Sequence, residues 1–193
     1  ISRSFPTNTK AQNRKIKRQF YRFFADMLLE GVKNLSISEH ELKKRFQIKN
    51  PELMNDLYQQ NKNVLLVSAH YLNWEWMITG QNFFFQHQAL GIGMPLTSKF
   101  WDHKINSLRS RYGMHVVHAK NVKTAFQHYA EQNIPTATLT LSDQSPADST
   151  KAYWTQFLNQ QTAVLFGAEH LANQYDQAVV FYLPKRLKRG YYS

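Results

Sequence analysis

The sequence of 193 residues contains no cysteine, so disulfides, thiolate metal sites and a cysteine nucleophile are all excluded within it. Acidic residues are also few: 13 Asp and Glu stand against 24 Lys and Arg, which gives a formal net charge of +11 and a pI near 9.8. No apolar run approaches the roughly 20 residues of a membrane-spanning helix. What the chain does contain, 42% hydrophobic and 14% aromatic residues, excludes a disordered chain and is sufficient for one folded core.

The excess of basic residues is concentrated near the two ends of the sequence. Residues 1–49 hold 12 of the 24 Lys and Arg against four acids, and a second basic group lies within residues 185–189. Such a balance indicates an anionic partner, which can be nucleic acid, phospholipid or an acidic protein. The clustering at the ends, together with the lack of any RNA- or DNA-binding motif in the sequence, argues against nucleic acid.

Residues 11–32 are predicted to form a helix, because apolar residues recur along one helical face. That face comprises Ile16, Phe20, Phe23, Phe24, Met27 and Leu28. Two interpretations stay open. The apolar face packs on the core while the basic side faces water, or the helix lies on anionic lipid.

The rest of the chain alternates between strand-like and helical patterns. Ser38 and Glu41 form a capping-box pattern that opens a second helix, which should stop before Pro51. Further helices are expected over residues 74–85, 100–112, 122–132 and 162–175, strands over 64–67, 114–117, 137–141 and 178–183, and a polar loop over 142–153. This alternation predicts an α/β fold with a mixed, largely parallel sheet flanked by helices.

The strongest candidate for chemistry is the segment from His70 to Glu75. His70 follows the end of a buried strand, where open α/β sheets place their active sites. Asn73 is a suitable N-cap, so Glu75 falls in the first helical turn, from which a carboxylate can fold back onto the imidazole and make it a better base. The alternative is structural: His70 ends a strand and Glu75 favours the helix dipole. A metal site is not expected, because no further ligand stands at suitable spacing.

Two other segments offer polar side chains. Arg109 and Arg111 stand before Gly113 at a helix end, where they can clamp a phosphate or carboxylate, or simply complement the helix dipole. Asp143 and Gln144 follow a second buried strand, so they should lie at the same sheet edge as His70. Asp143 can orient a substrate or an arginine, or it can form an Asx-type turn with the proline that follows.

Taken together, the segments resemble one known family, the late acyltransferases of lipid A biosynthesis in Gram-negative bacteria, and most of all its Bacteroidetes members. The resemblance rests on the order and spacing of motifs that include the His-x4-acid motif in its Asn-Trp-Glu form. These are Ser4-Phe5-Pro6, Ser68 to Trp76, Arg109-x-Arg111-x-Gly113, Asp143-Gln144, Tyr153 to Leu158 and Gly190-Tyr191-Tyr192.

The resemblance implies a fold similar to that of the glycerolipid acyltransferases, and transfer of an acyl chain from acyl carrier protein to a hydroxyl of a lipid A precursor. It implies no cofactor, with His70 as the general base, Glu75 as its orienting partner, Arg109 or Arg111 on anionic substrate groups, and Asp143 and Gln144 supporting the site. Family members often carry a Tyr-Arg-Pro or Tyr-Lys-Pro segment where this chain has Gly93-Met94-Pro95. We expect Lys99 to replace the missing cation in part.

The resemblance also sets expectations about location and about alternatives. We expect one acyltransferase domain over residues 1–193, taken from a longer protein with an N-terminal membrane anchor and further C-terminal elements, and held on the cytoplasmic face of the inner membrane. Two alternatives remain: acylation of a different membrane lipid, such as an aminolipid or glycerolipid, or a non-enzymatic basic module that binds nucleic acid or membrane.

Overall fold

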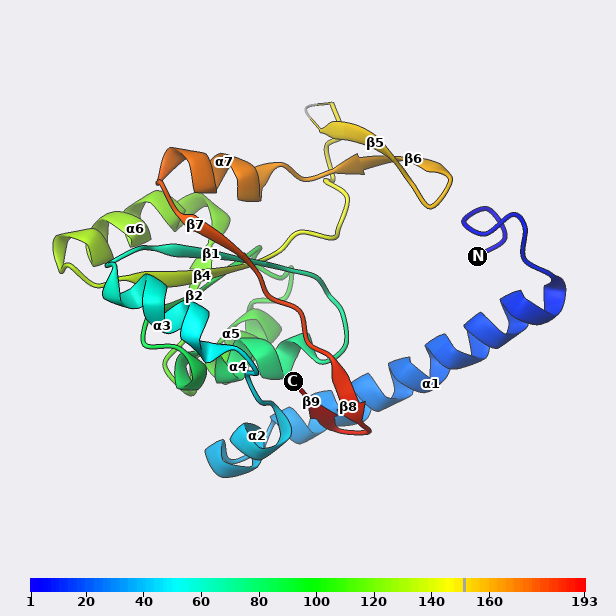
Figure 1. The fold of residues 1–193 in the computed structure, drawn as a ribbon, viewed down its shortest axis with the longest axis horizontal. Helices are drawn as coiled ribbons and strands as arrows, with labels where there is room; N and C mark the ends of the chain where they lie inside the picture. Colours follow the sequence, from blue (N-terminus) through cyan, green and yellow to red (C-terminus); the bar gives the residue numbers. More distant parts are fainter. Residues whose placement is uncertain (151) are drawn as a thin grey trace.

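A five-stranded parallel sheet forms the centre of the protein (Figure 1), as the computed structural model of residues 1–150 and 152–193 shows. The strand order is β3-β2-β4-β1-β7, and every neighbouring pair is parallel. The strands are β1 (Val64–Ser68), β2 (Gln88–Gly93), β3 (His115–His118), β4 (Thr136–Leu141) and β7 (Ala178–Phe181). The predicted α/β fold with a largely parallel sheet is therefore confirmed.

Helices cover both faces of the sheet, because successive side chains of a strand point to opposite faces. On one face, β1 packs Val64 and Leu66 into a core that includes Trp76 and Met77 of α4. On the other face, Leu90 of β2 packs into a second, smaller core with Phe126 of α6. The main helices are α2 (Glu39–Arg45), α3 (Pro51–Gln59), α4 (Trp74–Phe84), α5 (Lys99–Ser110), α6 (Val122–Glu131) and α7 (Gly167–Gln174).

Several local predictions hold and others fail. Ser38 caps α2 by accepting from the Glu41 N–H at 3.3 Å, and this helix ends before Pro51 as predicted. The predicted helix over residues 162–175 is wrong in its first part, because residues 162–164 belong to β6 (Gln160–Val164), which pairs with β5 (Tyr153–Phe157) in an exposed hairpin. The polar loop predicted over residues 142–153 gives way to β5 at its last residue, and position 151 within it lies outside the described residues. The short hairpin of β8 (Arg186–Lys188) and β9 (Tyr191–Tyr192), and the 3-10 turn η1 (Ala119–Asn121), were not predicted.

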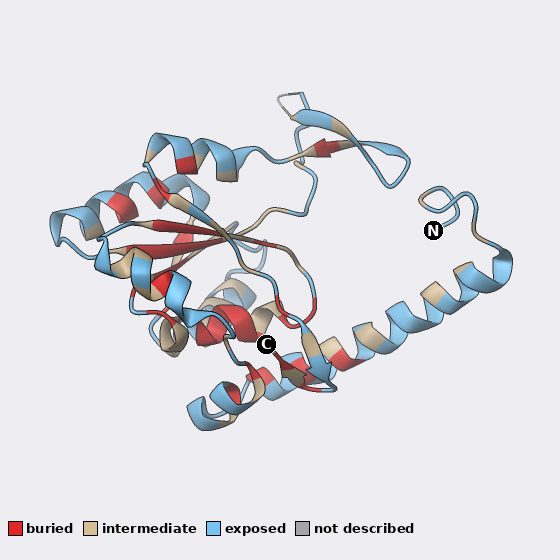
Figure 2. Ribbon diagram, viewed as in Figure 1, coloured by how far each residue is buried: buried red, intermediate tan, exposed pale blue. Residues whose placement is uncertain are grey.

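The N-terminal helix α1 (Lys10–Asn34) is long and projects from the body of the protein (Figure 1). Its predicted existence is confirmed, but the interpretation that its apolar face packs on the core is wrong for half of that face. Phe23 does pack against the core, whereas Phe20, Phe24 and Leu28 are exposed. Most of α1 is exposed (Figure 2), and its few buried residues are polar. Within the described residues, no helix is both long enough and apolar enough to cross a membrane.

Candidate active site

The site lies where the neighbouring strands β1 and β4 end, since parallel neighbours deliver their carboxyl ends to the same sheet edge. Ser68 of β1 pairs in register with Leu141 of β4, and the Ser142 N–H extends the ladder by donating to the Ser68 carbonyl at 2.9 Å. Two residues beyond Ser68 stands His70, and two residues beyond Leu141 stands Asp143. The sheet therefore brings together two side chains that are 73 residues apart in the sequence.

Asp143 holds His70 through two hydrogen bonds. Its Oδ1 accepts from the His70 backbone N–H at 3.0 Å and lies 2.8 Å from Nδ1 of the His70 ring. Burial alone would raise the pKa of the Asp143 carboxyl, but the hydrogen bonds from His70 outweigh it and hold that pKa below its usual range. An ionised carboxylate only accepts, so Nδ1 carries a hydrogen, and in the neutral imidazole Nε2 is then the nitrogen with the lone pair. Trp74 packs against the ring edge-to-face, with centroids 5.3 Å apart.

Glu75 has a different partner from the one that its spacing suggested. Among the described residues, the carboxylate on the His70 ring is that of Asp143, while Glu75 forms a bidentate ion pair with Arg109 of α5. Arg109 donates from Nε to Oε2 at 3.2 Å and from Nη2 to Oε1 at 2.5 Å. Glu75 therefore does not contact the imidazole as expected, and instead its ion pair with Arg109 connects α4 to α5. The physical reason is that the first turn of α4 places Glu75 toward α5, where a planar guanidinium matches both carboxylate oxygens.

A family model described as "Bacterial lipid A biosynthesis acyltransferase" matches residues 1–193. The chain belongs to this family. It is therefore an acyltransferase, an enzyme that works with an acyl donor and a lipid acceptor. A search of curated proteins found no match.

In this lipid A acyltransferase, the loop between His70 and α4 is fixed by buried polar contacts. Asn73 caps α4 as predicted, since its Oδ1 accepts from the Trp76 N–H at 2.9 Å. Its Nδ2 donates to the buried carboxylate of Glu30 in α1 at 2.6 Å. Leu72, between His70 and the cap, has a positive φ of 52° and is buried, a conformation that the surrounding contacts must enforce.

Glu30 and Tyr192 are site-supporting residues that sequence reasoning missed. The Tyr192 hydroxyl donates to both Glu30 oxygens, at 2.9 and 2.8 Å, and burial raises the pKa of this tyrosine, as does its contact with Glu30. The sequence carried only a weak signal: Asp26, Glu30 and Asn34 recur every four residues in a helix that is otherwise basic. A polar row of this kind is usually the solvated face of a helix, so the spacing alone does not reveal that these side chains are buried.

The remaining predicted site residues form no hydrogen bond with His70 among the described residues. Arg111 donates from Nη1 to the Leu35 carbonyl at 3.2 Å and stacks on the Tyr112 ring, while its Nε and Nη2 are covered and have no hydrogen-bond partner among the described residues. Lys99 is the exposed first residue of α5, and Gln144 is exposed in the loop after β4. No group of three or more His, Asp or Glu that could hold a metal ion occurs in the described parts of the chain.

Proposed function

We propose that the protein transfers a fatty acyl chain from acyl carrier protein to a hydroxyl of a lipid A precursor, with His70 as the general base. The observation that carries the proposal is the Asp143 carboxylate 2.8 Å from Nδ1 of His70, at the carboxyl ends of β1 and β4. Because Asp143 keeps the hydrogen on Nδ1, Nε2 is left free to accept a proton. The half-exposed ring is open to a substrate, since its side chain is 32% exposed.

The proposed reaction needs one proton shuttle and no group beyond the two substrates. Nε2 of His70 removes the proton of the acceptor hydroxyl as the oxygen attacks the thioester carbonyl carbon. The C=O electron pair moves onto the oxygen, then re-forms the double bond as the C–S bond breaks. The departing thiolate takes the proton back from Nε2, so the imidazole returns to its starting state. Asp143 stabilises the imidazolium that exists between these two transfers.

The Glu75–Arg109 pair supports the same chemistry by positioning. It ties the first turn of α4 to the last turn of α5, and these two helices contact each other. Two of the guanidinium nitrogens serve Glu75, which leaves Nη1 of Arg109 for an anionic group of the substrate. Arg111 is the second candidate for that group, but its two unmatched nitrogens are covered in this structure and would have to be uncovered to reach it. Lys99 and Gln144 are exposed and complete the proposed substrate contacts.

The charge of the protein supports the proposed donor and location. A net charge of +11 favours an acidic donor such as acyl carrier protein and favours anionic lipid, both through long-range attraction. We place the enzyme on the cytoplasmic face of the inner membrane, where a soluble donor can meet a membrane-embedded acceptor.

The proposed function is tested by lipid mass spectrometry of the source bacterium after the gene is deleted. The lipid A of the deletion strain should lack one acyl chain. The native gene should restore it, the His70→Ala gene should not, and His40→Ala, which changes an exposed histidine of α2, should behave as native. Intact lipid A together with a loss of acylated aminolipid or glycerolipid would transfer the activity to that other acceptor. Unchanged lipids in every class would refute the proposed function.

A further inference from the structure

Helix α1 turns its polar side toward the protein, which is the reverse of an ordinary surface helix. Asp26, Glu30 and Asn34, spaced at four-residue intervals, are its buried residues. Each has partners on a different part of the core. Asp26 pairs with Arg186 and Arg189, Glu30 accepts from Asn73 and Tyr192, and Asn34 donates to Thr79. These contacts fix which side of α1 faces inward, and they leave its apolar side exposed.

The exposed side of α1 is a continuous apolar stripe, here called the α1 stripe. At about 100° of rotation per residue, its members span roughly a third of the helix circumference. They are all at least 40% exposed: Phe20, Tyr21, Phe24, Leu28, Val32 and Leu35. Isolated exposed leucines are ordinary on a soluble protein, but a row of this kind marks a surface that is covered in use.

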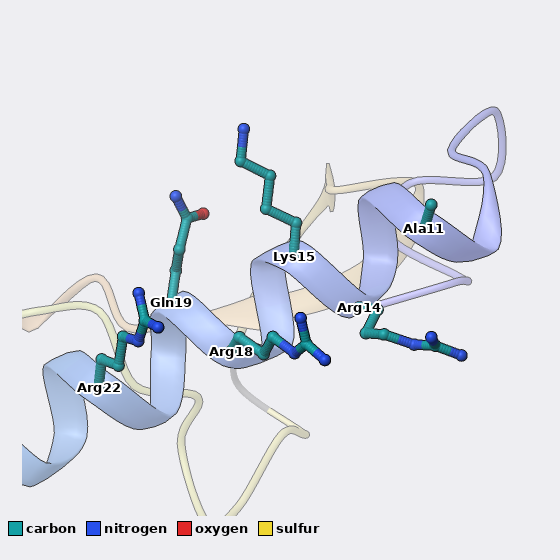
Figure 3. Close-up of a pocket in the computed structure, with 6 residues that line it drawn as sticks. All are labelled: Ala11, Arg14, Lys15, Arg18, Gln19 and Arg22. Atoms are coloured by element: carbon teal, nitrogen blue, oxygen red, sulfur yellow. The ribbon is translucent and has the colours of Figure 1, made fainter.

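A row of cations leads up to the N-terminal end of the α1 stripe and forms its basic border there. Arg14, Arg18 and Arg22 stand on successive turns, and with Lys15 they line a shallow hollow on the helix (Figure 3). Residues 10–22 carry six basic side chains and no acidic one, and all three arginines are exposed. The two acids of the helix, Asp26 and Glu30, are both turned inward and paired, so they do not offset this charge at the surface.

These observations select one kind of partner. Nucleic acid would use the arginines but not the apolar row, and an ordinary acidic protein surface would match the charge but not a stripe of this length. An anionic bilayer matches both, because acyl chains accept the apolar face while phosphates meet the basic border. We propose that α1 lies flat in the interface of an anionic bilayer, with the α1 stripe among the acyl chains and the arginines on the lipid phosphates.

Helix α1 is linked to the active site through the loop that carries His70. Glu30 connects the inward side of α1 directly to Asn73, the cap of the helix that carries Glu75. A bilayer-bound α1 therefore holds the His70 loop at a set position relative to the lipid surface. The inference deepens the membrane location proposed above and rests on that part of it, but its test measures binding rather than acyl transfer.

The test is co-sedimentation of the protein with vesicles of phosphatidylglycerol and phosphatidylethanolamine, compared with vesicles of phosphatidylcholine. The native protein should bind the anionic vesicles far more strongly. Phe24→Glu/Leu28→Glu should abolish binding, since it puts two carboxylates in the α1 stripe. Arg14→Gln/Arg18→Gln should weaken binding about 25-fold, at about five-fold for each cation lost near an anionic surface. The charge-matched control Thr124→Glu/Gln127→Glu, on the exposed side of α6, should bind as native.

Each alternative gives a distinct result. The proposal would be overturned if the native protein did not bind anionic vesicles, or if the stripe variants bound them as strongly as the native protein does. If the arginine variant keeps vesicle binding and loses acyl carrier protein, the basic border belongs to that acidic protein instead. A change in sedimentation coefficient with the stripe variants, without a change in vesicle binding, would assign the surface to a second copy of the chain. His70→Ala should bind vesicles as native, so a failure of the proposed chemistry stays separate from a failure of this inference. Melting curves confirm that each variant is folded.

Discussion

Replacing Asp143 with asparagine should slow acyl transfer while leaving the protein folded. Both hydrogen bonds from His70 go to Oδ1 of Asp143, and an amide oxygen in the same place can still accept them, so the loop keeps its shape. What disappears is the negative charge beside Nδ1, which stabilises the imidazolium after Nε2 takes the proton. Asp143 touches the base rather than the substrates, so kcat should fall and the KM for the acyl donor should change little.

The size of the effect follows from the geometry. Two unit charges about 4 Å apart attract by about 1 kcal/mol in water and about 4 kcal/mol near a protein surface. The side chains of His70 and Asp143 are 32% and 38% exposed, so solvent screens the pair and a value near 2.5 kcal/mol is appropriate. Since each 1.36 kcal/mol is tenfold in rate, kcat should fall about 50- to 100-fold.

The matched comparison is Glu75→Gln, which removes a carboxylate of the same motif that pairs with Arg109 instead. Both variants are assayed with acyl carrier protein thioester and the lipid acceptor, beside the native enzyme. Glu75→Gln should cost less than Asp143→Asn. If Glu75→Gln were as damaging as loss of His70 while Asp143→Asn stayed near native, then Glu75 would be the carboxylate that serves the base during turnover, and the reasoning above would be refuted.

Three further outcomes are expected. In Arg109→Lys, the lysine cannot form the two-point contact with Glu75, so kcat/KM for the lipid acceptor should fall several-fold while hydrolysis of the acyl donor is unchanged. Unchanged acceptor kinetics would assign Arg109 a purely structural role. Gly113→Ala should lower the free energy of unfolding by about 1–3 kcal/mol, measured in urea, because Gly113 has φ of 97° and a Cβ would lie 2.6 Å from Nδ2 of Asn82. Burial raises the pKa of the Asp26 carboxyl, but its two arginine partners outweigh burial and hold that pKa below the usual range. The ionised carboxyl therefore stabilises the fold fully above the unfolded pKa of about 4. This stabilisation is lost as the pH falls through the lower pKa of the folded state. Melting curves should therefore show the advantage of the native protein over Asp26→Asn shrinking below pH 4.

Much of the fold could be predicted from sequence because its strands and helices carry strong periodic patterns. The apolar run of β1 and the alternation with helices indicated a parallel sheet. β2 was missed, because Gln88–Gly93 contains two glycines and little β-branched character. It is a strand through its pairing with β3 and β4, which no local pattern reveals. The β5–β6 hairpin was missed because its turn uses Leu158 and Asn159 at positive φ, a weaker signal than a glycine turn.

The site shows a similar division between local and tertiary information. The position of His70 follows from its place after a buried strand, and the sequence also placed Asp143 at the same sheet edge. The sequence could not decide which carboxylate contacts the His70 ring, because Asp143 reaches the ring only if β4 lies directly beside β1. The order of the strands in the sheet is a tertiary property that no local pattern reveals. Spacing within one segment favoured Glu75, and only the orientation of the first turn of α4 directs that side chain to Arg109.

The orientation of α1 was beyond sequence reasoning for a related reason. Periodicity identifies an apolar face but does not say what covers it. Here the inward side is decided by buried hydrogen bonds of Asp26, Glu30 and Asn34 to residues far along the chain.

The role of His70 as the base is measured by single-turnover transfer of a labelled acyl chain from acyl carrier protein to the lipid acceptor, with native enzyme, His70→Ala and His40→Ala. We expect His70→Ala to slow formation of the labelled lipid by about 10²–10⁴-fold, with an unchanged melting temperature and with His40→Ala at the native rate. Near-native transfer by a folded His70→Ala protein would show that His70 is not the base.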